Sequence, residues 1–404
     1  MTKKLSGYYI VFIGSLFYCY EFFLRVSPSA ITDVLMHHFK ADAGSFAAMS
    51  AAFFYAYMPM QVFAGLIGDR YGVKKVLVCC IAICSLSTVL FAISDNYWIA
   101  MLSRFFMGVS ASFAYVGPLI LASVWLKPKY YSAAAGLIQV LGSFGAYLVG
   151  TSFGASMLQN NWQVTYIKVA AIGLVLMLLV LAFVKNKPKS IKHTPEPSLN
   201  IISSLKTLIN CSQTRWIALL GFAFWAPMSI FGELWGVKFL HEGEGVSLLL
   251  AGEQMQWLWL GVAIGGPCWG ALSCYNRTLV TKIAYISAAL SSCVFLFHIG
   301  GNILLINSML FVFGFACAAQ CLSFGFMRDF QSSSLIGSAV GFTNMCVIMG
   351  GTVLQPLSGF IIDFLCKKVC FLSAMQYTFI IMPLISLFGL YIIMFKIKDT
   401  KSDE

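Results

Sequence analysis

The stretch Gly65-Leu-Ile-Gly-Asp69-Arg70-Tyr-Gly72-Val-Lys74-Lys75 joins two long apolar runs of the chain. Glycine at position 72 permits a tight turn that a larger residue would strain. Asp69 can lie against a helix N-terminus, where a carboxylate is stabilised by about 0.3–1 kcal/mol. The basic residues of the stretch can also simply anchor the turn at a membrane surface. Eleven residues therefore predict a charged turn between two apolar helices.

The composition of the whole chain agrees with that turn. Of its 404 residues 59% are apolar and 10% are charged, and the mean hydropathy is +0.84. Soluble globular chains carry roughly 25% charged residues, so this composition excludes a soluble enzyme. The 35 phenylalanines and 34 glycines suit helices packed in lipid. We predict an integral, multi-pass protein whose surroundings are the lipid bilayer.

Membrane spans follow from the length of the apolar runs, because a helix needs about 20 apolar residues to cross a bilayer. Glycine, proline and charge clusters divide the chain into twelve such runs. They cover 8–31, 46–66, 76–94, 97–126, 132–154, 164–184, 216–236, 249–273, 279–299, 303–326, 335–362 and 371–395. The segment 185–215 begins with lysines and prolines and is typical of a polar linker. The sequence predicts an N-terminal bundle over 1–184, a cytoplasmic linker over 185–215 and a C-terminal bundle over 216–404.

The net charge of +11 has a topological explanation. With the N-terminus in the cytoplasm, 19 of the 26 lysines and arginines fall on the cytoplasmic side. Four fall on the other side, namely Lys40, Lys238, Lys367 and Lys368, and three lie within spans, namely Arg25, Arg104 and Lys168. Such a bias sets membrane orientation. We therefore expect both termini in the cytoplasm and no nucleic-acid partner.

The two halves of the chain share glycines at a fixed offset of 205 residues. Gly65 aligns with Gly270, Gly136 with Gly341, Gly145 with Gly350 and Gly154 with Gly359, and Gln139 aligns with Asn344. Six plus six spans in parallel repeat are typical of a transporter with a central path. These glycines can equally be packing points, and both explanations stay open.

The spacing Gly-x-x-x-Asp-Arg-x-Gly-x-Lys-Lys between the second and third spans resembles the signature loop of the major facilitator superfamily, with every position filled. The resemblance implies an all-α membrane fold of twelve transmembrane helices in two six-helix bundles, related by a pseudo-twofold parallel repeat. It places Asp69 near Ser334–Leu335, at the start of span eleven, in a contact that holds the outward-open state. It implies gating roles for Gly65, Asp69, Arg70, Gly72, Lys74 and Lys75. The equivalent turn of the second half has Cys274 and Tyr275 in place of the acid–base pair and keeps only Arg277.

Charged residues inside spans are costly, so each is a functional candidate. Glu21 and Arg25 are four residues apart and share one helix face. At 1.5 Å per residue, Arg25 and Arg104 lie about 9 and about 10 Å below the outer membrane surface. Two arginines at one depth could bind an anion, and Glu21 could carry the coupled proton. The alternatives are a Glu21–Arg25 pair that only stiffens span one, and an Arg104 that resembles the family's span-four arginine, often linked to proton movement.

Other polar and aromatic residues complete the expected path. We predict that the substrate-binding set comprises Arg25, Arg104, Tyr18, Tyr115, Trp225 and Gln320, although aromatic residues in spans are often packing residues. Gln139 and Asn344 form a symmetric pair suited to a gate or to interhelical hydrogen bonds. Glu233 is expected at the water-facing rim of span seven.

Several functions are disfavoured by missing motifs. The chain has no ATP-binding Gly-x-x-x-x-Gly-Lys-[Ser/Thr] loop and no protease or lipase motif. The 13 cysteines form neither a disulfide framework nor a metal-binding pattern. We expect no catalytic residue, cofactor or metal.

Three functions remain to be compared. The sequence favours a monomeric secondary transporter, whose partners are a small solute and protons, in a bacterial inner membrane. Its expected activity is proton-coupled uptake of a small organic anion, by likeness to the organic-anion and sugar-phosphate branches. Span seven lacks the arginine of sugar-phosphate carriers, which weakens that likeness. The alternative is a proton-coupled exporter of a metabolite, siderophore or drug, but span five lacks the Gly-Pro pair of drug antiporters. A receptor on the same scaffold has no supporting feature.

Overall fold

The computed structural model describes residues 3–150, 156, 161–185, 201–297, 302–331 and 335–397. Throughout these ranges the regular structure is helical, and no strand occurs in them. Much of the linker expected over 185–215, namely 186–200, lies outside the described residues, as does Gly154 of the repeat.

The described chain forms two compact units. Unit 1 comprises Met1–Ser27 and Ala52–Ser198, and unit 2 comprises Pro28–Ala51 and Leu199–Glu404. The division in the linker matches a polar segment of the sequence, but the segment Pro28–Ala51 belongs to the unit formed by the second half of the chain.

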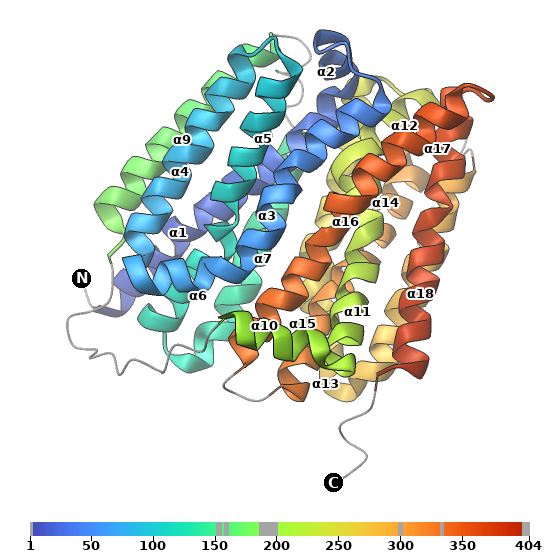
Figure 1. Ribbon diagram of the computed structural model, residues 1–404. Helices are drawn as coiled ribbons and strands as arrows, with labels where there is room; N and C mark the ends of the chain where they lie inside the picture. The colour runs from blue at the N-terminus through green and yellow to red at the C-terminus, as the bar shows by residue number, and fades with distance from the viewer. Residues whose placement is uncertain are drawn as a thin grey trace. The chain divides into compact units, whose positions relative to one another are not determined.

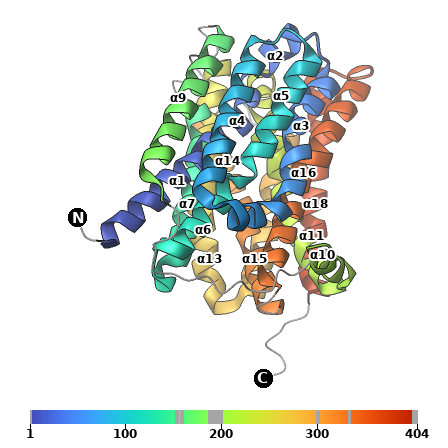
Figure 2. The same ribbon diagram turned by 60° about the vertical axis from the view of Figure 1, so that its left-hand side comes forward.

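Unit 1 is a bundle of long helices, in which α4 packs against both α5 and α9 (Figures 1 and 2). Helix α1 packs against α6 and α7. The helices are α1 (Lys3–Val26), the larger part of α3 (Ala43–Tyr71), α4 (Val73–Ile93), α5 (Tyr97–Ala111), α6 (Phe113–Trp125), α7 (Pro128–Val149) and α9 (Trp162–Phe183).

Unit 2 contains the remaining helices, and α11 packs against α16 and α18 (Figure 1). Its first elements are η1 (Ser27–Ile31), which begins at the unit boundary, α2 (Thr32–His38) and the start of α3. The others are α10 (Ile201–Asn210), α11 (Ser212–Ile230), η2 (Phe231–Trp235), α12 (Gly236–Glu244), α13 (Leu248–Cys293), η3 (Val294–Leu296), α14 (Ile303–Cys317), η4 (Ala318–Gln320), α15 (Cys321–Phe330), α16 (Ile336–Cys366), α17 (Phe371–Phe379) and α18 (Ile381–Phe395).

Ten segments of the described chain are long and apolar enough to cross a membrane. The expected spans 249–273 and 279–299 fall in one of them, Leu248–Leu296, which is interrupted at Asn276 by a non-helical backbone (φ −155°, ψ 98°). The fifth expected span contains a shorter apolar helix, Ala134–Val149. Together these segments make the chain an integral multi-pass membrane protein.

Prolines explain two departures from regular α-helix. Pro28 has no N–H to donate to the carbonyl of Leu24, and α1 ends at Val26, where a 3₁₀ turn begins. Pro227 lies inside α11, and a π-helix, η2, starts four residues after it. Single-turn π segments are frequent at functional sites.

Glycines allow helices to approach closely at matching places in the two units. In unit 1 a Cβ at Gly108 would lie 1.9 Å from the Phe53 carbonyl oxygen, and one at Gly145 would lie 2.0 Å from that of Cys19. In unit 2 a Cβ at Gly314 would lie 2.0 Å from the Leu258 carbonyl oxygen. Backbone therefore packs directly on backbone where α5 crosses α3, where α7 crosses α1 and where α14 crosses α13.

Gly72 adopts the backbone conformation expected of it. Its φ of 83° lies in the region that favours glycine, and it ends the turn between α3 and α4. The tight turn that the sequence predicts is confirmed.

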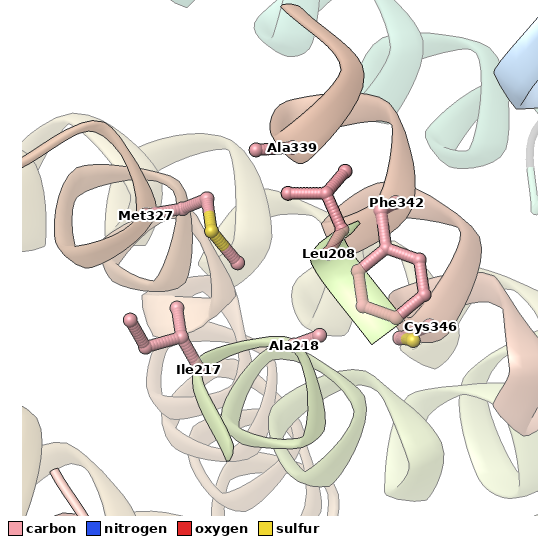
Figure 3. Packing of buried hydrophobic residues seen from close by; sticks show 7 residues of the cluster. All are labelled: Leu208, Ile217, Ala218, Met327, Ala339, Phe342 and Cys346. Carbon is pink, nitrogen blue, oxygen red and sulfur yellow. The ribbon is translucent and has the colours of Figure 1, made fainter. Parts of the chain in front are cut away.

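The linker helix α10 is docked on unit 2 by apolar side chains. Leu208, which is fully buried, contacts a cluster formed by α11, α15 and α16 (Figure 3). The other members are Ile217, Ala218, Met327, Ala339, Phe342 and Cys346. This cluster fixes the end of the linker to the second half of the chain.

Candidate functional site

A buried ion pair lies near the C-terminal end of α1. The Arg25 side chain is 2% exposed and that of Glu21 is fully buried. Both Nε (2.8 Å) and Nη2 of Arg25 donate to the same oxygen, Oε1 of Glu21. The helical spacing of four residues produces this contact, and the two charges neutralise each other in a medium that solvates ions poorly.

Aromatic rings surround the Arg25 guanidinium. Its central carbon lies 4.2 Å from the ring centroid of Phe22, one turn back on α1, and 4.8 Å from that of Tyr57 on α3. Phe53 and Phe54 lie at 5.7 and 5.8 Å. Ring faces attract a planar cation, so the guanidinium is held in a fixed orientation.

Arg104, from α5, binds the end of α1. Its Nη1 donates to the carbonyl oxygen of Leu24 at 2.8 Å, and its Nη2 donates to that of Arg25 at 3.4 Å. Pro28 has no N–H to donate to the Leu24 carbonyl, and Arg104 and the Ser27 hydroxyl (3.2 Å) both donate to it instead. The Arg104 Nε–H has no hydrogen-bond partner among the described residues.

The two arginines share one ring. Phe53 lies 5.7 Å from the Arg25 guanidinium carbon and 5.0 Å from that of Arg104. Glu21, Arg25 and Arg104 are the buried charged side chains of the described part of unit 1. Their formal sum is one positive charge, which is costly to bury without an anion.

Three further predicted residues meet beside this cluster. The Tyr18 hydroxyl donates to Oε1 of Gln139 on α7 at 3.4 Å, and its ring lies 5.1 Å from that of Tyr115 on α6. Tyr18 also packs edge-on against Phe22 at 5.3 Å, which connects it to the Arg25 environment. Unit 1 therefore brings together Glu21, Arg25, Arg104, Tyr18, Tyr115 and Gln139.

The predicted position of Glu233 is wrong. This residue lies in η2 and is 1% exposed, so it is a buried residue rather than a water-facing one. The indole Nε1 of Trp225 donates to Glu233 Oε1 at 3.3 Å. A count of residues to the helix end missed this burial, because α12 extends the helical segment by nine more residues.

Unit 2 also contains polar side chains that the sequence did not single out. Gln355 on α16 is fully buried, and its Nε2 donates to the Ser229 carbonyl oxygen at 2.9 Å. The predicted residues Gln320 and Asn344 are both half-buried, in η4 and α16. A glutamine beside a proline within an apolar helix is the sequence feature that could have identified Gln355.

The gating residues lie at and beside the turn after α3. Arg70 is exposed and its guanidinium carbon lies 5.5 Å from the Tyr71 ring centroid. Lys74 is half-buried and Lys75 exposed in the first turn of α4. The side chain of Asp69, and the surroundings of Gly65, lie outside the described residues. No cluster of three or more metal-ligating side chains occurs in the described ranges.

The sequence profile of the Major Facilitator Superfamily matches residues 11–353. The chain belongs to the Major Facilitator Superfamily. It is therefore a transporter of small solutes and not an enzyme, as the signature loop predicted.

Two transporters with which the chain can be aligned are distant in sequence. The hexuronate transporter of Bacillus subtilis (strain 168) is 22% identical over 78% of this chain and 78% of its own length. The 3-(3-hydroxy-phenyl)propionate transporter of Escherichia coli (strain K12) is 24% identical over 74% of this chain and 73% of its own.

Solved structures of superfamily members share the fold. A bacterial homolog of the human lysosomal transporter Spinster, in an inward-facing and occupied conformation, has a TM-score of 0.78 at 14% identity, with 98% of this chain and 97% of the other covered. The nucleoside transporter NupG has a TM-score of 0.76 at 16% identity over 97% and 99% of the two chains.

Proposed function

We propose that this superfamily member takes up a small monoanionic organic acid together with a proton. The observation that carries the proposal is the charge balance of unit 1, where two buried arginines accompany one buried carboxylate. One solute carboxylate would replace the negative charge that Glu21 loses on protonation, so the site would keep the same charge with and without the solute. The hexuronate and aromatic-acid transporters among its relatives support an anionic solute.

The geometry suggests how proton and solute would be coupled. Arg25 donates twice to Glu21, so a solute anion must compete with that carboxylate for the guanidinium. Protonation of Glu21 removes the competitor and makes Arg25 available. Binding linkage is reciprocal, so a bound anion also favours the protonated form of Glu21. In this scheme Tyr18, Tyr115, Arg104, Trp225 and Gln320 contact the solute, and the turn at 65–75 acts with Gln139 and Asn344 as gate.

We further propose twelve spans in two repeated bundles, in a monomer of a bacterial inner membrane with both termini in the cytoplasm. The close helix contacts support the repeat. Gly108 packs on the backbone of Phe53 and Gly314 on that of Leu258, and Phe53 and Leu258 are 205 residues apart. The charge bias supports the orientation.

A ligand-stabilisation screen in detergent tests the function. Hexuronates and aromatic propionates would be compared with neutral, zwitterionic and cationic solutes on wild type and on Arg25→Ala. At 100 times its dissociation constant a ligand stabilises the folded state by about 2.7 kcal/mol, so anions should raise the melting temperature of wild type only. Stabilisation by bulky or cationic compounds alone, with no effect of anions, would contradict uptake of an anion and favour the exporter.

A further inference from the structure

The N-terminus of α3 is bound by a carboxylate from a distant helix of the same unit. The first backbone N–H groups of a helix have no partner within it. Here the Ala43 N–H donates to Oδ1 of Asp363 at 3.0 Å, and the Gly44 N–H donates to Oδ2. One carboxylate near the end of α16 thus receives two of the four groups.

A third such group, the Ser45 N–H, is satisfied locally, and Phe46 makes the first regular bond of the helix. The Ser45 N–H donates to Oδ1 of Asp42 at 2.8 Å, and the Phe46 N–H donates to the Asp42 carbonyl oxygen at 2.9 Å. Hydrogen bonds from Ser45 lower the pKa of the Asp42 carboxyl. Asp42 therefore stabilises its own helix, whereas Asp363 ties that helix to another element.

Small residues bring the two helices close enough for this contact. A Cβ at Gly359, one turn before Asp363, would lie 2.5 Å from the Ala43 carbonyl oxygen and 2.7 Å from the Ala47 Cβ. A Cβ at Gly44 would lie 2.8 Å from Asp363 Oδ2. Any larger residue at 44 or 359 would move α3 away from α16.

Two more contacts hold the segment Pro28–Ala51 within unit 2. Lys238 of α12, whose side chain is 7% exposed, pairs with Asp33 of α2 and with Glu242 at 2.8 Å. The Phe46 ring packs edge-on against Trp235 at 5.9 Å. Figure 1 shows α2, α12 and α17 at one end of unit 2, with α10 at the other. The charge bias assigns the end with α2 and α12 to the outside of the membrane.

We propose that Asp363 is a functional residue of the transport cycle, a polar clasp that holds the outer ends of α3 and α16 together and releases when the outer side opens. The inference rests on the alternating access proposed above. The contact suits a reversible gate, because water can serve both the carboxylate and the two N–H groups once the helices part. A dry apolar contact would have no such substitute.

The clasp has no counterpart in the other half of the sequence. At the offset of 205, Asp363 corresponds to Leu158, and Ala43 and Gly44 correspond to Leu248 and Leu249. The contact made by Asp363 is therefore not repeated at the equivalent positions of the first half of the sequence.

Accessibility of a buried cysteine near the N-terminal end of α3 tests the proposal. Ser50 is 1% exposed and lies three residues after Ala47 on α3, so Ser50→Cys is a near-isosteric reporter. It would be placed in full-length protein in cells, with exposed Cys366 and Cys370 changed to serine. A membrane-impermeant thiol reagent added outside would label it in proportion to the outward-open fraction.

Asp363→Ala should raise the labelling rate about fivefold, the effect of losing a helix cap of ordinary strength. Asp42→Ala, which removes a cap of the same helix, should leave the rate within about twofold. Asp363→Asn keeps one acceptor and should give an intermediate rate. Equal rates for Asp363→Ala and Asp42→Ala would overturn the clasp.

A second measurement covers the case of a poorly folded variant. The affinity for a hexuronate would be measured in right-side-out and inside-out vesicles, and Asp363→Ala should tighten outside binding and weaken inside binding. Equal affinities on both sides in a variant that still binds would overturn the proposal. If no variant, wild type included, binds or transports any anion, the proposed function fails, whereas normal transport with an unchanged labelling rate refutes only the clasp.

Discussion

Arg25 illustrates why residue type matters inside a membrane. A guanidinium is planar, so it can lie 4.2 Å from the Phe22 ring centroid while it donates two N–H groups to Glu21. A lysine ammonium is a point charge without this planar fork of donors. Arg104 uses the same geometry differently, to reach two carbonyl oxygens at the end of α1.

Replacing Glu21 by glutamine should separate anion binding from pH. Wild-type affinity for an anionic solute should tighten as pH falls, by up to about tenfold per unit where one proton accompanies each anion. Glu21→Gln removes both the titrating group and the competitor of the solute, so its affinity should be constant between pH 5.5 and 8. Binding isotherms over that range measure the effect.

Glu253→Gln is the matched control, since Glu253 is an exposed carboxyl on α13. It should keep the wild-type pH dependence. A Glu21→Gln variant with the wild-type slope would show that Glu21 is only the structural partner of Arg25.

For individual residues, the sequence predicted part of the candidate site. The four-residue spacing predicted the Glu21–Arg25 contact, because both residues lie on one helix. It could not predict that Arg104 binds the Leu24 carbonyl, since that depends on which helix packs beside Pro28. Glu233 and Asp363 were missed for a related reason: their burial and partners depend on helices far away in sequence.

Helix crossings depend on single glycines. Gly108→Ala would force a Cβ to within 1.9 Å of the Phe53 carbonyl oxygen, and α5 would have to move away from α3. Overpacking of this kind costs about 1–3 kcal/mol or more. We expect a clear fall in melting temperature in detergent, and a weaker anion response because Arg104 lies one turn away on α5.

Gly136→Ala tests the opposite case. A Cβ there meets nothing within 4 Å, and alanine favours a helix interior over glycine by about 1 kcal/mol. Its melting temperature should stay the same or rise. If Gly136→Ala lowered the melting temperature as much as Gly108→Ala, the contact between Gly108 and the Phe53 backbone would not explain the loss of stability in Gly108→Ala.

Element boundaries followed from the sequence where apolar runs end in charges or glycine. The Gly72 turn and the helix α9 after Asn161 are examples. The connection at Asn276 was harder, because the chain there stays helical on both sides of one non-helical residue. Segment 28–51 belongs to unit 2. Its contacts with Trp235, Lys238 and Asp363 join positions far apart in the chain, so they could not be predicted from the sequence.

For the whole transporter, Asp69 and Asp363 should bias the cycle in opposite directions. The family resemblance assigns Asp69 to the outward-open state, and a carboxylate at a helix terminus contributes about 0.3–1 kcal/mol. Asp69→Asn should therefore lower the labelling of Ser50→Cys about two- to fivefold and reduce transport, with expression unchanged.

The double variant Asp69→Asn/Asp363→Ala provides the check. Distant sites usually combine additively, so its labelling rate should return toward that of wild type. Asp69→Glu, which keeps the charge, should retain transport. Unchanged transport in Asp69→Asn would remove Asp69 from the gate.

The pair between Asp33 and Lys238 has a consequence for the origin of the chain. The two residues are 205 positions apart, the same offset that aligns the glycines of the two halves. Under the proposed repeat, equivalent positions that touch would lie at the axis that relates the two halves. In an ancestral dimer of identical subunits, each would have faced a copy of itself, and two like charges repel. Under the proposed repeat, an acid–base pair at equivalent positions requires two halves that have diverged in sequence.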